Sequence, residues 1–252
     1  MSRSGAIVLA LVAAALAGCG GNRTASSPPL VERTFGTGAH QVWVYQEKDR
    51  SPRDLVVFLH GLGGPTEDTP ANHLAWLRHL AHQGSMVVYP RYERYPGDPQ
   101  APRLLVETMT ALSRSADLSG IPFVLIGYSR GGGLAVTYST VASVTGLEPD
   151  VVVGLYPAIN DRQLDPGGLA AGTRFVFLVG DRDEVVGRRG AEALRRWLTT
   201  NSYPKELITV STVASSPEFE ATHLSVLEDS AGARKALWEP VDRLVENVRA
   251  PG

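Results

Sequence analysis

Continuous runs of apolar residues recur along the chain and predict the strands of a buried sheet. The runs that begin at Leu55, Met86, Phe123, Val151 and Phe175 are almost unbroken, as expected for strands that are covered on both faces. Together with two weaker segments, the predicted strands cover residues 41–46, 55–59, 86–90, 122–127, 151–156, 174–180 and 206–211.

Segments with helical periodicity fall between or after these strands. The regular alternation of strands and helices predicts an α/β fold, in which helices cover both faces of a mostly parallel central sheet. The predicted helices cover residues 71–83, 101–116, 130–144, 188–200 and 230–248.

The N-terminal segment has the pattern of an export signal. Arg3 precedes an apolar stretch over residues 6–17, which is too short to span a membrane. The stretch ends in Leu-Ala-Gly-Cys, residues 16–19, which resembles the bacterial lipobox. This resemblance implies a lipoprotein signal peptide over residues 1–18, a lipid-anchored tether over 19–39 and a folded domain over 40–252.

Cys19 is the only cysteine of the chain and stands at the lipidation position of the lipobox. The alternative is an ordinary secretory signal with an incidental cysteine. If Cys19 is lipidated, the protein is exported and anchored to the bacterial cell membrane or outer membrane, and its partners include that membrane. No thiol then remains for a disulfide bond or for thiol catalysis.

The composition is that of one globular domain. The chain has 252 residues, of which 43% are hydrophobic and 20% charged. A formal net charge of −2 provides no basic surface for nucleic acid, so we expect no nucleic-acid partner.

A Gly-x-Ser-x-Gly motif, residues 127–131, follows one of the apolar runs and precedes a predicted helix. In that context the motif predicts a sharp strand-to-helix turn that presents the hydroxyl of Ser129 as a nucleophile. The flanking glycines relieve crowding at a turn that puts the serine in an unfavourable backbone conformation. The alternative is an ordinary glycine-rich turn without a chemical role.

Acidic residues follow the predicted strand 174–180, at the sheet edge where α/β proteins place their sites. Asp181, Asp183 and Glu184 are the candidates for the acid of a catalytic triad. Alternatively, some of them, and Asp181 first of all, cap the helix that follows.

His223 is the only one of six histidines that lies after these acids, in a polar loop before the last helix. That order, nucleophile then acid then base, favours His223 as the general base over an ordinary surface histidine. His73, His79 and His82 fall on one predicted helix, where a solvated face is the expected explanation and no metal site is predicted, because no acid or cysteine accompanies them.

The loop after the strand 55–59 reads His-Gly-Leu-Gly-Gly, residues 60–64. Its backbone N–H groups can stabilise the negative charge of a tetrahedral intermediate, and His60 is expected to orient the loop. With the Gly-Tyr-Ser-Arg-Gly motif, the acids and His223, this loop makes residues 40–248 resemble the α/β-hydrolase family. The elbow itself is similar to that of lidless lipases, polyester hydrolases and chlorophyllase-like members, which often carry arginine after the serine.

The resemblance implies roles for particular residues. Gly-Asp-x-Asp-x-Val-Val, residues 180–186, resembles the acid loop of many α/β-hydrolases, which makes Asp183 the triad acid. The oxyanion donors are then the N–H groups of Leu62 and of Arg130, the residue directly after the nucleophile. No metal or other cofactor is implied. Cap domains of the family commonly follow the strand after the nucleophile helix, where only residues 157–173 are available, so no large cap is expected.

The loop 89–97 contains Tyr89, Tyr92, Tyr95 and several arginines at the end of a predicted strand. We expect it on the rim of the site, where it either contacts an aromatic or anionic substrate group or only packs and shields the loop.

These features predict a serine hydrolase that acts on small-molecule or lipid carboxylic esters through Ser129, Asp183 and His223. An envelope acyltransferase would use the same residues, and an amidase or thioesterase would look much the same. A non-catalytic ligand-binding lipoprotein is a further alternative, because fold alone does not determine function.

Overall fold

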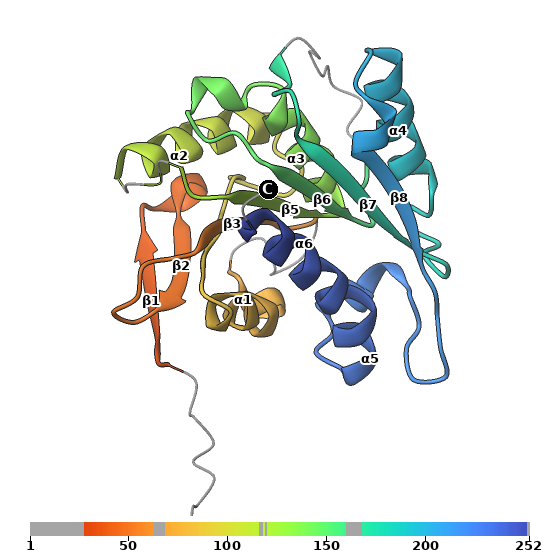
Figure 1. Ribbon diagram of the computed structural model, residues 1–252, viewed down its shortest axis with the longest axis horizontal. Helices are drawn as coiled ribbons and strands as arrows, with labels where there is room; N and C mark the ends of the chain where they lie inside the picture. Colours follow the sequence, from red (N-terminus) through yellow and green to blue (C-terminus); the bar gives the residue numbers. More distant parts are fainter. Residues whose placement is uncertain (1–27, 63–68, 116–117, 119, 160–167, 251–252) are drawn as a thin grey trace, which may run out of the picture.

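Eight strands form one sheet in the order β1-β2-β4-β3-β5-β6-β7-β8 (Figure 1). The computed structural model describes residues 28–62, 69–115, 118, 120–159 and 168–250. The strands are β1 (Leu30–Phe35), β2 (Val42–Glu47), β3 (Asp54–Leu59), β4 (Ser85–Pro90), β5 (Phe123–Tyr128), β6 (Val151–Leu155), β7 (Arg174–Gly180) and β8 (Ile208–Val213).

The sheet is parallel from β4 through β3, β5, β6 and β7 to β8, and antiparallel only where β1 meets β2 and β2 meets β4. The predicted mostly parallel α/β architecture is therefore confirmed. Every residue of β3, β5 and β6 is buried, which explains why their sequences are continuously apolar rather than alternating.

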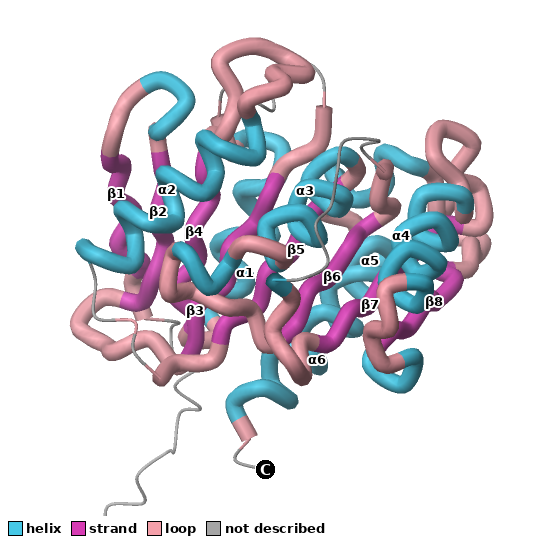
Figure 2. The backbone as a smooth tube through the Cα atoms, turned by 90° about the horizontal axis from the view of Figure 1, so that it is seen from above, coloured by secondary structure: helices cyan, strands magenta, loops and turns pink. Residues whose placement is uncertain are grey.

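Helices cover both faces of this sheet, as Figures 1 and 2 show. The helices α2, α3 and α4 lie on one face, and α1, α5 and α6 lie on the other. Their bounds are α1 (Leu74–His82), α2 (Ala101–Ser115), α3 (Arg130–Ser139), α4 (Arg189–Thr200), α5 (Ala231–Ala233) and α6 (Glu239–Arg249), with a π-helical turn, Arg234–Trp238, between the last two.

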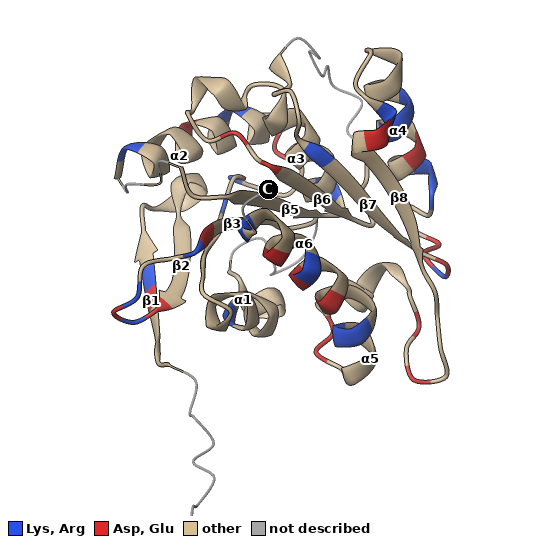
Figure 3. Ribbon diagram, viewed as in Figure 1, with Lys and Arg blue, Asp and Glu red and all other residues tan. Residues whose placement is uncertain are grey.

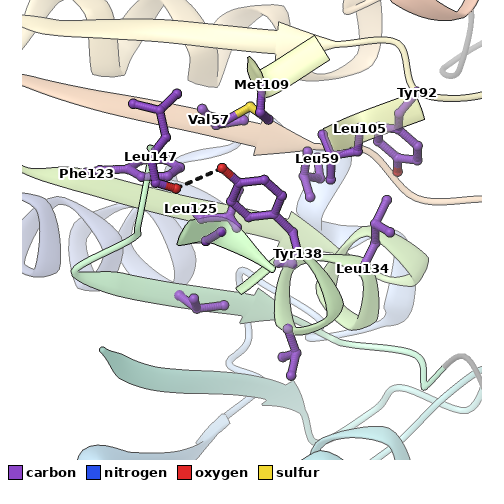
Figure 4. Packing of buried hydrophobic residues seen from close by; sticks show 14 of the residues in the cluster. Val57, Leu59, Tyr92, Leu105, Met109, Phe123, Leu125, Leu134, Tyr138 and Leu147 are labelled. Atoms are coloured by element: carbon purple, nitrogen blue, oxygen red, sulfur yellow. Dashed lines mark hydrogen bonds between the residues drawn. The ribbon is translucent and has the colours of Figure 1, made fainter. Parts of the chain in front are cut away.

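Each face of the sheet packs its own hydrophobic cluster. Figure 4 shows the α2–α3 side, where Met109 of α2 and Leu134 and Tyr138 of α3 lie against β3 and β5. The buried hydroxyl of Tyr138 has a hydrogen-bond partner, because it donates to the carbonyl of Leu147 at 2.8 Å. On the other side, Trp76 of α1 stacks on Trp238 with ring centroids 5.4 Å apart.

Charged residues recur along α4 and α6 (Figure 3). In α4 the residues Ala191, Leu194 and Leu198 are buried, whereas Arg195 and Arg196 are exposed. This separation is the helical periodicity that predicted the element from the sequence. None of the described helices is both long and apolar enough to cross a membrane.

The sheet begins earlier in the chain than the sequence predicts. Residues Leu30–Phe35 overlap the predicted tether 19–39, and they form the outer strand β1, which pairs antiparallel with β2. Its sequence, Leu-Val-Glu-Arg-Thr-Phe, is not a continuous apolar run, because an edge strand is only partly covered. The predicted signal peptide and Cys19 lie outside the described residues.

A buried ion pair joins the last helix to the start of the sheet. The guanidinium of Arg249 at the end of α6 contacts the carboxylate of Asp54 at the start of β3, and both side chains are buried. Arg249 also donates a hydrogen bond of 2.9 Å to Oγ of Ser85, the first residue of β4. Breaking a buried pair by removing one partner leaves an uncompensated charge inside the protein.

We therefore predict that Arg249→Met lowers the free energy of unfolding by about 3–5 kcal/mol. The matched control is Arg53→Met, which removes an exposed partner of Glu246, a residue that Arg249 also contacts, and should cost at most about 1 kcal/mol. Chemical denaturation of the two variants measures the difference. Equal effects would show that the Arg249–Asp54 pair contributes no more than a surface contact.

Candidate active site

Ser129 lies between β5 and α3 in a backbone conformation that few residues other than glycine adopt. Its φ of 52° and ψ of −119° turn the chain sharply from the strand into the helix. Backbone hydrogen bonds hold the turn: Ser129 N–H donates to the carbonyl of Leu155 at 2.9 Å, and the carbonyl of Ser129 accepts from Ala158 at 2.8 Å and from Gly132 at 2.9 Å. Such conformations persist only where the surrounding structure imposes them, and they are common at functional sites.

The two glycines of the motif are required by close backbone contacts. A Cβ atom on Gly127 would lie 2.2 Å from the carbonyl oxygen of Gly131. A Cβ atom on Gly131 would lie 2.4 Å from the carbonyl oxygen of His60 and 2.5 Å from that of Leu59. The elbow thus packs directly on the end of β3, which a side chain at Gly131 would push away. A side chain at Gly127 would instead push the first turn of α3 away from β5.

The structure brings Ser129, His223 and Asp183 together at the carboxyl ends of the strands. His223 Nε2 lies 3.0 Å from Ser129 Oγ, and His223 Nδ1 lies 3.0 Å from Asp183 Oδ2. All three residues are buried. With Nδ1–H donating to the carboxylate, Nε2 is the free base that can accept the proton of the serine hydroxyl.

Asp183 is held as a carboxylate. Burial alone would raise its pKa, but the hydrogen bonds from His223 and from the backbone N–H groups of Val186 and Val185 outweigh burial and lower the pKa below its usual value. The two N–H groups lie 3.0 and 2.9 Å from Asp183 Oδ1, which leaves Oδ2 for the imidazole. An ionised Asp183 fixes the tautomer and the orientation of His223.

The hydrogen bond to Nδ1 of His223 comes from Asp183, not from either of the other two candidate acids. Asp181 accepts hydrogen bonds from the N–H and the hydroxyl of Ser215, at 2.9 and 2.5 Å, and these bonds lower its pKa. The expectation that Asp181 caps the next helix is therefore wrong, because its partner is the segment after β8. Glu184 is exposed.

The loop after β3 passes beside Ser129. A Cβ atom on Gly61 would lie 3.2 Å from the Cβ of Ser129, so Leu62, the next residue, adjoins the nucleophile. Arg130 is the first residue of α3, where backbone N–H groups have no partner within the helix. Of the two predicted oxyanion donors, Leu62 thus follows a residue that lies against Ser129, and Arg130 follows Ser129 itself.

The side chain of Arg130 points away from this opening into a buried polar network. Its guanidinium pairs with the buried carboxylate of Glu93 and donates a hydrogen bond of 2.9 Å to the carbonyl of Asp98. Arg94 donates to the carboxylate of Asp98 at 2.7 and 3.0 Å, which holds the pKa of that carboxyl well below its usual range. The elbow is thereby fastened to the loop that follows β4.

This network also decides what the loop 89–97 does. Tyr89, Tyr92 and Glu93 are buried, so most of the loop packs and shields the site, as one of the two expectations states. Only Arg94 and Tyr95, of its aromatic and charged residues, have exposed side chains.

Two tyrosines that the sequence did not single out position the histidine loop. The hydroxyl of Tyr128, the residue before the nucleophile, donates a hydrogen bond of 2.9 Å to the carbonyl of His223. The hydroxyl of Tyr156 lies 3.1 Å from Oγ of Ser225. A buried tyrosine in or next to an apolar strand needs a hydrogen-bond partner for its hydroxyl. This requirement was the sequence signal that could have pointed to Tyr128 and Tyr156 as residues that hold a neighbouring loop.

The remaining histidines differ in their surroundings. His60 is buried, its ring stacks on Tyr92 at 4.2 Å, and its Nδ1–H donates to the carbonyl of Gly61 at 2.8 Å, which agrees with an orienting role. The predicted solvated face of α1 is wrong for His73, which is buried against Phe58. His79 also has an acidic partner that the sequence concealed, Asp242 of α6, at 2.9 Å.

No protein-family model matches the chain, and no curated protein matches it. Among solved structures, esterase B from Lactobacillus rhamnosis is similar, with a TM-score of 0.65, 16% sequence identity, and coverage of 87% of this chain and 86% of that chain. Carboxyl esterase 2 from the fungus Tuber melanosporum has a TM-score of 0.65 at 15% identity and covers 90% of both chains. An alpha/beta hydrolase from a Medee basin deep-sea metagenome library has a TM-score of 0.63 at 15% identity, covering 87% of this chain and 98% of that chain.

The chain has the α/β-hydrolase fold. The predicted fold class is therefore confirmed, and no large cap domain is present among the described residues, because only residues 156–173 connect β6 to β7. At identities this low, the likeness shows the fold, and the chemistry has to be argued from the site itself.

A buried histidine beside the oxyanion loop makes stability depend on pH. Burial, and secondly the nearby His60, lower the pKa of His73 from 6.5 to about 3. Neither of its ring nitrogens has a hydrogen-bond partner among the described residues. Between these two pKa values the unfolded chain binds the proton and the folded protein does not, so stability falls as the pH drops below 6.5.

We predict that His73→Phe removes up to about 2 kcal/mol of the stability loss between pH 7.5 and pH 5. Denaturation midpoints at several pH values measure this slope. His82→Gln is the control, because His82 is exposed on the same helix and its removal should leave the slope unchanged. A wild-type slope in His73→Phe would mean that other groups dominate the acid sensitivity.

Proposed function

We propose that this protein is a membrane-anchored serine hydrolase that cleaves carboxylic esters outside the cytoplasm. The observation that carries the activity is the pair of 3.0 Å contacts that link Ser129 Oγ to His223 and His223 to Asp183. The strained elbow at Ser129 and the position of the loop after β3 support the same proposal. Anchoring and export rest on the lipobox-like sequence that ends at Cys19.

The geometry supports acylation of Ser129 with proton transfer to His223. Ser129 Oγ attacks the ester carbonyl carbon while His223 Nε2 takes the hydroxyl proton. Asp183 stabilises the positive imidazolium that forms. The backbone N–H groups of Leu62 and Arg130 hold the negative oxygen of the tetrahedral intermediate.

Collapse of this intermediate breaks the bond to the alcohol, which leaves with the proton from His223. Water, deprotonated by the same nitrogen, then attacks the acyl-enzyme, and the acid is released as Ser129 recovers its proton. If an alcohol replaces this water, the same residues transfer the acyl group, which is the acyltransferase alternative.

The direct test is reaction with a fluorophosphonate probe and hydrolysis of soluble p-nitrophenyl esters. Ser129→Ala should abolish both while the thermal midpoint stays close to that of the wild type. Asp183→Asn should lower kcat by about 10⁴-fold, because the imidazole loses its tautomer and its counter-charge. Asp181→Asn is the matched control and should retain activity, because Asp181 contacts Ser215 instead.

These results separate the candidate functions. Turnover by Ser129→Ala would refute the nucleophile, and loss of activity in Asp181→Asn alone would refute Asp183 as the acid. A folded wild-type protein that neither reacts with the probe nor cleaves esters would favour the ligand-binding lipoprotein. Ester products formed from an added alcohol in place of free acid would favour the acyltransferase.

The anchoring proposal has its own prediction. Cys19→Ala removes the residue that accepts the lipid. The variant should therefore stay unlipidated and leave the membrane fraction of the expressing bacterium. Metabolic labelling with an alkyne fatty acid measures lipidation directly, and Ser4→Ala in the same leader serves as the control. Unchanged labelling and fractionation of Cys19→Ala would refute the lipobox.

A further inference from the structure

Exposed apolar side chains surround the opening to Ser129. Leu62, Tyr95, Ile159, Val185 and Leu224 are each 40–67% exposed, and we call this set the apolar rim. Among the described residues, the other large apolar side chains with comparable exposure are Phe35 on the outer strand β1 and Val141 and Val144 beyond the end of α3. Scattered exposed apolar residues are ordinary, but a cluster of them around one opening marks a binding surface.

The rim adjoins the reacting groups on every side that the structure describes. Val185 and Leu224 line, together with His223, one hollow of about 530 Å³. Val185 and Ile159 line a second hollow of about 610 Å³ beside the segment that hydrogen-bonds to the carbonyl of Ser129. The two hollows therefore share Val185 and form a continuous surface.

The opposite side of the rim comes from the loops after β3 and β4. Leu62 follows Gly61, which adjoins Ser129, and a Cβ on Gly97 would lie 3.8 Å from Leu62 Cδ1. Gly97 belongs to the loop that carries Tyr95. Because Arg130 and Glu93 fasten that loop to the elbow, Tyr95 has a fixed place relative to the nucleophile.

The charges of the rim are nearly balanced. The positive residues that line the two hollows are Arg182, Arg188, Arg189 and Arg196, and the negative residues are Glu184, Glu192 and Glu220. A surface with so little net charge has no electrostatic preference for an anionic partner. Its exposed apolar side chains favour a neutral, poorly hydrated partner instead.

We infer that the apolar rim docks the protein onto the surface of an aggregated, neutral, water-insoluble carboxylic ester. This inference rests on the proposed function, since the docked surface must present an ester carbonyl to Ser129. The described residues hold no large cap over this surface, and one of its hollows is lined by His223, so a molecule still held in an aggregate can reach the site.

Tributyrin provides both forms of one neutral ester, dissolved below its solubility limit and as droplets above it. The wild type should show a further rise in rate once droplets are present. The double variant Tyr95→Ser with Leu224→Ser should lower the ratio of droplet rate to dissolved rate about tenfold or more, because two rim contacts are lost. All variants, the wild-type reference included, are made in the full chain with Cys19→Ala, so that a lipid on Cys19 cannot bind droplets or vesicles in place of the rim.

The matched control is Val141→Ser with Val144→Ser, which changes two exposed apolar residues beyond the C-terminal end of α3, at the end opposite the elbow, and should keep the wild-type ratio. An unchanged ratio in the rim variant, or the same fall in the control, would overturn the inference. So would a rim variant that loses binding to phosphatidylcholine vesicles but keeps its droplet rate, since the rim would then serve the membrane.

A binding measurement keeps this inference separate from the proposed function. Ser129→Ala protein should float with tributyrin droplets in a density gradient, and adding the two rim substitutions should abolish flotation. If flotation depends on the rim but protein with Ser129 intact does not hydrolyse tributyrin, the proposed hydrolase activity is refuted and docking stands. If that protein hydrolyses tributyrin but flotation does not depend on the rim, docking is refuted and the hydrolase stands.

Discussion

The close contact between the nucleophile elbow and the end of β3 is the constraint on which the site depends. Ser129 adopts a left-handed backbone conformation that costs on the order of 1–3 kcal/mol, and its neighbours must impose it. They do so because Gly131 lies directly against the carbonyls of Leu59 and His60, which leaves the elbow no room to relax. The same contact sets the distance from Ser129 to the loop that carries Leu62, the proposed oxyanion donor.

The strand order turns this local contact into a complete site. β5 lies between β3 and β6, so the loops after those two strands flank Ser129. β7 follows β6 and carries Asp183 to the same edge, and the chain returns from β8 with His223. Parallel strands end at one edge, which is why residues far apart in sequence meet there.

The sequence predicted the parts of the fold whose signal is local. Strands buried on both faces read as continuous apolar runs. The Gly-x-Ser-x-Gly pattern at residues 127–131 likewise marks the sharp turn in the sequence itself. The order of Ser129, Asp183 and His223 then narrowed the site to residues that the structure brings within hydrogen-bond distance.

What the sequence could not predict depends on partners from other elements. β1 is an edge strand whose only paired strand is β2, and its polar residues therefore read as a tether. A resemblance to the family's acid loop favoured Asp183 over Asp181, but the partner of Asp181, Ser215, could not be predicted because it lies beyond β8. The environments of His73 and His79 likewise come from Phe58 and Asp242, which lie in other elements.

The ion pair between Asp54 and Arg249 has a consequence for how the chain is made. Asp54 opens the first parallel strand, whereas its partner lies on α6, which follows every strand of the sheet in chain order. During synthesis the ribosome therefore releases the whole sheet before the charge at its base can be neutralised. A nascent chain in this state holds an unpaired carboxylate that favours water over the core. The base of the sheet is therefore completed only when α6 packs against it.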